Sequence, residues 1–122
     1  MAARLGRLKQ RAEYLRVRGA GRRFATPGLV LQAAAAPGQA GFRVGFTVSR
    51  RVGNAVSRNR ARRRLKAVAE MILPQHAATG LDYVVIGRQG AVSRPFLLLA
   101  GDMENALHRL GLWRDGEPAE RG

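Results

Sequence analysis

Apolar and polar residues alternate most regularly over residues 42–48, FRVGFTV. The apolar members share one face of an extended chain: Phe42, Val44, Phe46 and Val48. That period of two predicts a half-buried strand. Residues 28–35, GLVLQAAA, predict another strand, and the turn-forming segment APGQAG lies between the two. We therefore expect these strands to form a hairpin. The unbroken apolar run LDYVVIG at 81–87 predicts a strand buried on both faces.

Apolar residues recur at helical spacing near both ends of the chain. Over residues 8–18, Leu8, Ala12 and Leu15 share one side, and the glycines of GAGRR (19–23) interrupt the pattern. The second such segment covers residues 95–110, with an apolar side made of Leu98, Leu99, Met103, Ala106, Leu107 and Leu110. Each pattern predicts an amphipathic helix.

A third helix is predicted within a strongly basic segment, SRRVGNAVSRNRARRRLK (49–66), which has eight Arg or Lys residues and no acidic one. At about 100° per residue, one core-facing stripe forms from Ala61, Leu65, Val68, Ala69 and Ile72. The helix should begin at a cap formed by Asn54 or Ser57 and end at Leu73, before Pro74. The segment is therefore predicted to be a folded surface and not a loose basic tail.

The elements follow in the order helix, strand, strand, helix, strand, helix. This order predicts an α+β fold, a two-layer α/β sandwich with a mixed sheet of about four strands packed on one side by helices. The other face of the sheet would then be partly open, which makes it a candidate groove. We expect one domain over residues 1–113 and a disordered tail over 114–122, RDGEPAERG.

Charge points to a polyanionic partner. The formal net charge is +14, and the thirteen basic residues between Glu13 and Glu70 have no acidic residue among them. Of the 22 basic residues 20 are Arg, which suits phosphate binding, although a genome rich in G and C would give the same bias. The cationic side of the middle helix is the expected phosphate-binding surface. Asn59 on that side suits a base edge, a phosphate, a metal-bound water or a helix cap equally well.

Composition excludes several kinds of catalytic site. The chain has no Cys, which rules out disulfides, thiolate zinc sites and Cys nucleophiles. No apolar run approaches the roughly 18 residues of a membrane helix, and a cytoplasmic location fits best. His76 and His108 have no partner nearby in sequence, and Asp82 suits a turn or a metal contact. With no paired carboxylates, triad or metal cluster in the sequence, we do not expect protein side chains alone to catalyse a reaction.

The segment GFTVSRRVGNAVSRNRARRRLKAVAE (45–70) resembles the signature of the bacterial ribonuclease P protein family, and a weaker likeness covers residues 8–112. The signature positions are Ser49–Arg51, Gly53–Val56 and Arg58–Asn59–Arg60. The resemblance implies a monomeric protein in a 1:1 complex with a catalytic RNA. That ribonucleoprotein removes the 5′ leader of precursor tRNA as an endonuclease, with Mg²⁺ and the RNA carrying the chemistry. It also implies a left-handed strand–helix–strand crossover, as in the second domain of ribosomal protein S5, against the usual right-handed rule.

The resemblance also implies roles for individual residues. The surface facing the catalytic RNA would comprise Arg50, Arg51, Arg58, Asn59, Arg60, Arg62, Arg63 and Lys66. The cleft for the single-stranded leader would comprise Tyr14, Arg18, Gln32, Arg43 and Thr47. Family members often have aromatic residues at the positions of Arg18 and Gln32, so we expect charge and hydrogen bonding to replace part of the base stacking. Many members are apolar at the position of Arg64, which leaves its exposure open.

A second hypothesis is a small ribosomal or RNA-chaperone protein with no catalytic role. Such a basic module has no reason to carry Ser-Arg-Arg, Gly-Asn-Ala-Val and Arg-Asn-Arg in this order. We therefore favour the ribonuclease P subunit. No metal site made by the protein alone can be identified from the sequence.

Overall fold

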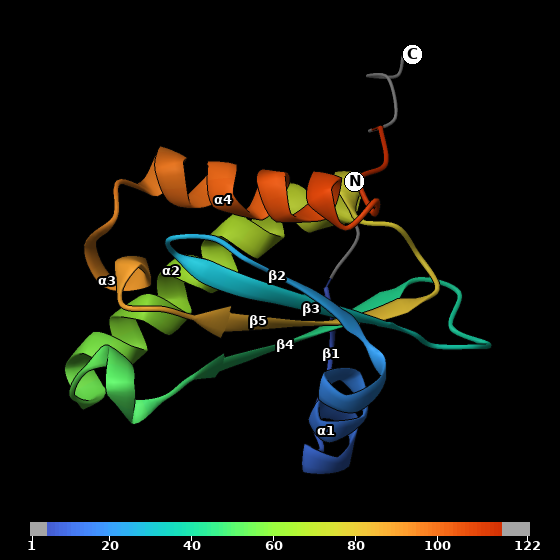
Figure 1. The fold of residues 1–122 in the computed structure, drawn as a ribbon, viewed down its shortest axis with the longest axis horizontal. Helices are drawn as coiled ribbons and strands as arrows, with labels where there is room; N and C mark the ends of the chain where they lie inside the picture. Colours follow the sequence, from blue (N-terminus) through green and yellow to red (C-terminus); the bar gives the residue numbers. More distant parts are fainter. Residues whose placement is uncertain (1–4, 116–122) are drawn as a thin grey trace.

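The computed structural model describes residues 5–115 (Figure 1). The elements are strand β1 (Gly6–Arg7), helix α1 (Arg11–Ala20), β2 (Arg22–Ala25), β3 (Leu29–Ala35), β4 (Phe42–Val48), the 3-10 helix η1 (Arg50–Val52), α2 (Ala55–His76), β5 (Leu81–Gly87), α3 (Gly90–Ser93) and α4 (Phe96–Arg109). The α+β class is confirmed. The described part of the chain has a five-stranded sheet, because the sequence pattern missed the short edge strands β1 and β2.

The strand order is β1-β4-β5-β3-β2. The predicted hairpin of β3 with β4 is wrong, since β5 lies between them, antiparallel to β3 and parallel to β4. Alternation indicates which side chains share a face, but not which strand is the neighbour. β3 forms its hairpin with β2 instead. The segment 36–41 crosses the end of β5, where Gly80 donates its N–H to the carbonyl of Gly41.

The parallel pair β4 and β5 is connected through α2, which crosses one face of the sheet beside α4 (Figure 1). The predicted strand–helix–strand crossover is therefore present, and its left-handedness stays a prediction. α1 is the exception to the prediction that helices pack on one side, because it lies against the opposite face (Figure 1).

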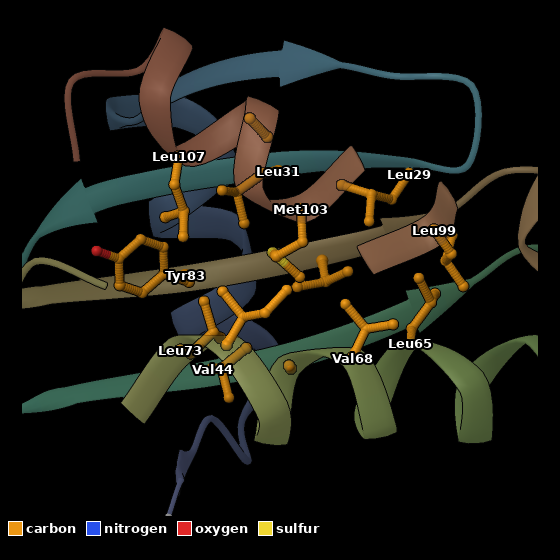
Figure 2. Close-up of a cluster of buried hydrophobic side chains, with 14 of the residues drawn as sticks. Leu29, Leu31, Val44, Leu65, Val68, Leu73, Tyr83, Leu99, Met103 and Leu107 are labelled. Carbon is orange, nitrogen blue, oxygen red and sulfur yellow. The ribbon is translucent and has the colours of Figure 1, made fainter. Parts of the chain in front are cut away.

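The main core lies between the sheet and the helices α2 and α4 (Figure 2). The predicted stripe of α2 is confirmed, because all five of its residues are at most 3% exposed: Ala61, Leu65, Val68, Ala69 and Ile72. They share this core with Leu29 of β3, Val85 of β5 and Met103 of α4. The predicted double-sided burial of β5 is also confirmed, since its residues 82–85 are all buried.

Asn54 is the cap of α2, because its Oδ1 accepts a hydrogen bond from the N–H of Ser57 at 2.9 Å. The predicted end of this helix at Leu73 is wrong, since the helix continues through Pro74 to His76. Pro74 lies in the last turn, where a missing N–H removes one helical hydrogen bond without interrupting the turns before it.

We expect Asn54→Ala to lower the free energy of unfolding by about 1 kcal/mol, because the N–H of Ser57 loses its acceptor. Denaturant unfolding followed by circular dichroism measures the change. Asn54→Asp keeps an acceptor at the positive end of the helix and should retain the stability. Equal stability of Asn54→Ala and the unmodified protein would contradict the role of the cap.

The C-terminal end of the domain corrects the predicted apolar side of the last helix. Leu98 is 51% exposed, because the buried side of α4 runs through Leu99 and Met103 instead. The fold also gives the two histidines an aromatic neighbour: the ring of Trp113 stacks between His76, with centroids 4.0 Å apart, and His108, at 4.4 Å. Trp113 is partly buried and packs against the main core.

The first residue of the predicted tail, 114–122, contacts the folded domain. Arg114 donates from its Nε to the carbonyl of Ala77 at 3.1 Å, which attaches this residue to the end of α2. The part of the predicted tail at 116–122 lies outside the described residues.

Few apolar contacts hold α1 on the second face of the sheet. Its predicted apolar side is wrong in part, because Leu15 is 47% exposed and Leu8 lies before the helix. Val17 is the one fully buried residue of α1, within a small cluster that includes Leu8, Ala34 and Val84. Because this contact area is small, part of the sheet stays open beside α1.

Candidate nucleic-acid interface

Two hollows meet at Tyr14, along the open part of the sheet and its β4 edge. The α1 hollow, of about 360 Å³, is lined by Arg11, Tyr14, Leu15, Arg18, Arg23, Gln32, Thr47, Val84 and Ile86. The α2 hollow, of about 450 Å³, is lined by Arg7, Leu8, Tyr14, Val44, Gly45, Phe46, Asn59, Arg62, Arg63 and Lys66. The two linings contain basic residues and no acidic one. Together the two hollows form a basic strip that favours a polyanion. The ring of Tyr14, which lines both hollows, lies at the middle of this strip.

The α2 hollow lies where the edge of β4 is unpaired. β1 pairs only with Arg43 and Val44, so the rest of this edge faces the basic side of α2. Asn59 is not a helix cap. Its Oδ1 accepts a hydrogen bond from Nη1 of Arg62 at 3.3 Å, and both residues line the hollow. Arg63 and Lys66 make no ion pair within residues 5–115, which leaves their charges available to an anion.

The α1 hollow brings together four of the five residues expected in a leader cleft: Tyr14, Arg18, Gln32 and Thr47. They come from α1, β3 and β4, which are separated in sequence. Gln32 is 5% exposed, and within residues 5–115 no partner hydrogen-bonds its carboxamide. A buried amide without a partner is costly, so a ligand that supplies one would gain affinity.

Gly45 is the seat of the Tyr14 ring. A Cβ placed on Gly45 would lie 2.5 Å from Cε2, Cζ and the hydroxyl oxygen of Tyr14. The ring therefore rests directly on the backbone of β4, at the junction of the two hollows. The Tyr14 hydroxyl donates to the carbonyl of Leu8 at 3.4 Å, and the exposed part of the ring is a platform for stacking.

Three arginines of α2 bind backbone carbonyls. Arg58 donates from Nη1 to the carbonyl of Gly53 at 2.9 Å. Arg60 donates from Nε to Val92 at 2.8 Å, and Arg64 donates from Nη1 to Ala91 at 2.8 Å. Burial, and then the charge of Arg60, lower the pKa of Arg64. Arg64 is therefore a half-buried support for α3, which resolves its exposure.

Arg43, the fifth residue expected in the leader cleft, is held by carboxylates. Its Nε and Nη2 donate to Asp82 at 2.9 and 2.8 Å, and its Nη1 donates to Glu13 at 2.7 Å. The hydrogen bond to Asp82 is the largest cause that raises the pKa of Arg43. Arg16 forms a further ion pair with Asp82. The structure thus gives Arg43 a connection between α1 and the sheet, whereas its contact with a leader stays a prediction.

Arg50 and Arg51 lie in η1, apart from the α2 hollow. Both are exposed. Arg51 lines a third depression, of about 650 Å³, together with Arg88 and Gln89. Arg51 and Asn59, both members of the signature, therefore line different hollows.

Sequence reasoning missed Gly45 and the pairing of Asp82. A glycine inside a regular strand pattern signals a close approach to the backbone, so Gly45 could have been found. Asp82 is 0% exposed, and a buried acid in a basic chain requires a cationic partner. The partners themselves depend on strand order, which the sequence pattern did not reveal.

Two further features, a metal-binding cluster and a membrane-spanning helix, are absent from the described residues. Within 5–115 there is no group of three His, Asp or Glu side chains placed to hold a metal ion. Among the helices of this same range, none combines the length and apolar character that crossing a membrane requires.

The chain is similar to known proteins in both sequence and fold. Residues 2–111 match the family model described as Ribonuclease P. The chain is 55% identical to the ribonuclease P protein component of Paramagnetospirillum magneticum, over 98% of this chain and 93% of that protein. It is 46% identical to the component of Gluconacetobacter diazotrophicus, over 92% and 97%. The solved RNase P protein of Staphylococcus aureus superposes with a TM-score of 0.77 at 26% identity, over 91% of this chain and 100% of that one.

Proposed function

The chain belongs to the ribonuclease P protein family, and on that premise we propose that it binds the catalytic RNA of ribonuclease P and the 5′ leader of precursor tRNA. In this role it promotes endonucleolytic maturation of the tRNA 5′ end in the cytoplasm, as a single copy per RNA. The observation that carries the proposal is the continuous basic strip with Tyr14 at its middle.

The two hollows suit two RNA elements. Arg62, Arg63 and Lys66 project from one rigid helix and suit the phosphates of a folded RNA. The α1 hollow combines one aromatic ring with Arg11 and Arg18, which suits a single strand whose bases are free to stack. We therefore propose that α2 faces the catalytic RNA and that the leader passes over Tyr14.

Magnesium ions belong to the proposed reaction, and among residues 5–115 no group of three His, Asp or Glu side chains is placed to hold one. The carboxylate of Asp82, which the sequence left as a metal candidate, is held by Arg16 and Arg43. We propose that the RNA supplies the metal ligands, while the side chains of this protein bind and orient the leader.

Replacing Gln32 by an apolar residue should make the protein more stable and weaken its binding of the leader. We expect Gln32→Leu to raise the free energy of unfolding by about 1 kcal/mol, because the substitution removes a buried amide without a partner. The same variant should bind precursor tRNA about three- to tenfold more weakly, since the leader loses a hydrogen bond. Denaturant unfolding and equilibrium binding measure the two effects. Mature tRNA, which lacks the leader, is the control, and an equal loss for both RNAs would contradict the contact.

Reconstitution tests the function as a whole. The protein is mixed with a bacterial ribonuclease P RNA and precursor tRNA at a magnesium concentration too low for the RNA alone to act efficiently. We expect faster cleavage at the mature 5′ end than with the RNA alone. A ribosomal or chaperone protein would not accelerate this cleavage, so an unchanged rate would reject the proposed function.

A further inference from the structure

We propose that Asp82 is a positioning residue, which fixes α1 against the sheet so that Tyr14 lies where a leader can stack on it. The inference rests on the proposed function and extends it to a buried carboxylate that does not touch RNA. Asp82 belongs to the central strand β5, and its side chain is 0% exposed.

The side chains around Asp82 form a network of ion pairs that connects β5 with β4 and α1. Arg43 of β4 binds both oxygens of Asp82 and also donates to Oε2 of Glu13 in α1. Arg16 of α1 binds Asp82 directly and donates to the carbonyl of Ala35 at 3.0 Å. Glu13 and Arg16, which precede and follow Tyr14 in the sequence, thus attach helix α1 to the strands β3, β4 and β5 through polar contacts.

Glu13 connects this network of ion pairs to the first turn of α1. Its Oε1 accepts hydrogen bonds from the N–H groups of Lys9 at 2.9 Å and Gln10 at 3.0 Å. These backbone hydrogen bonds are the main cause that lowers the pKa of Glu13. The carboxylate therefore stays charged and holds the first turn of α1 and Arg43 at the same time.

Polar attachment matters here because the apolar seat of α1 is small. Val17 is the single fully buried residue of α1, whereas α2 buries six residues of its own. Removing the charge of Asp82 would leave Arg16 and Arg43 side by side without their shared anion. Their repulsion would act directly on α1, and Tyr14 would leave its place over Gly45.

The test compares Asp82→Asn with Asp102→Asn. Asp102 provides a matched control on the opposite side of the sheet, because it is 6% exposed and binds Arg94 at 2.8 and 3.1 Å. Each protein is reconstituted with a bacterial ribonuclease P RNA, and its affinities for precursor and mature tRNA are measured. We expect Asp82→Asn to reduce the preference for precursor tRNA about five- to tenfold. Asp102→Asn should leave that preference within about twofold.

A second measurement follows the ring itself. The chain has two tyrosines, so labelling with 3-fluorotyrosine gives one fluorine resonance for Tyr14 and one for Tyr83. In Asp82→Asn the Tyr14 resonance should move toward the value of an exposed tyrosine, while that of Tyr83 stays. An unmoved Tyr14 resonance overturns the proposal, and so does a moved resonance with an unchanged preference for precursor tRNA.

Two further outcomes are possible, and each has its own test. Should Asp82→Asn fail to fold, Glu13→Gln replaces it. The side chain of Glu13 is half-buried, and a Gln there can keep the backbone contacts while Arg43 loses a charged partner. The expected reduction is then about two- to threefold, and an unchanged preference rejects the proposal. Should the unmodified protein not prefer precursor tRNA, the proposed function fails, and the fluorine resonance alone decides whether Asp82 positions Tyr14.

Discussion

Replacing Arg62, Arg63 and Lys66 together by Ala should weaken binding of the catalytic RNA by about three orders of magnitude or more. Each of the three residues lines the α2 hollow, and each charge-assisted contact to a phosphate contributes about 1.5 kcal/mol or more. The dependence of binding on salt should also change. The slope of log K against log salt concentration should become less steep by about one unit for each lost phosphate contact. Titrations of the RNA at several salt concentrations measure both effects.

Single substitutions provide the matched control for that experiment. Arg63→Ala and Arg109→Ala remove the same charge, but Arg109 belongs to α4 and lies over the ring of Phe24, with its guanidinium carbon 5.3 Å from the centroid. Only Arg63→Ala should alter the salt slope. Arg60→Ala should have a smaller effect, because the Nε of Arg60 is already bound to Val92. Equal slopes for Arg63→Ala and Arg109→Ala would mean that net charge, and not the α2 hollow, determines binding.

The local elements could be predicted from sequence because they depend on periodicity alone. The stripe of α2 from Ala61 to Ile72 follows from the 3.6-residue repeat, and all its members are buried. The pairing of β3 with β5 could not be predicted in this way, because alternation is the same whichever strand is the neighbour. The short strands β1 and β2 also lack enough residues to show a period.

The site shows the same division. The basic side of α2 was evident from charge and helical phase. Tyr14, Arg18, Gln32 and Thr47 line one hollow, whereas their contact with a leader stays a prediction. Charge alone did not distinguish Arg63 from Arg64, although one lines the α2 hollow and the other supports α3. That difference depends on where α3 lies, and α3 was not predicted.

Substituting Gly45 by Ala should impair leader binding as strongly as removing the Tyr14 ring. The added Cβ would come within 2.5 Å of three ring atoms, so the ring must leave its seat on β4. Base stacking on an aromatic side chain contributes about 1–3 kcal/mol, so both Gly45→Ala and Tyr14→Ala should weaken precursor tRNA binding by about 10- to 100-fold. Mature tRNA should bind these variants as it binds the unmodified protein.

A double-mutant cycle separates this explanation from a general loss of structure. If Gly45→Ala acts through the ring, it has no further effect on precursor tRNA once Tyr14 is already Ala, and the two losses are not additive. The small methyl group then occupies the space that the ring has left, so the double variant should also be as stable as Tyr14→Ala alone. Additive losses in the double variant would show that Gly45 matters to the β4 edge itself. The leader would then contact that edge independently of Tyr14.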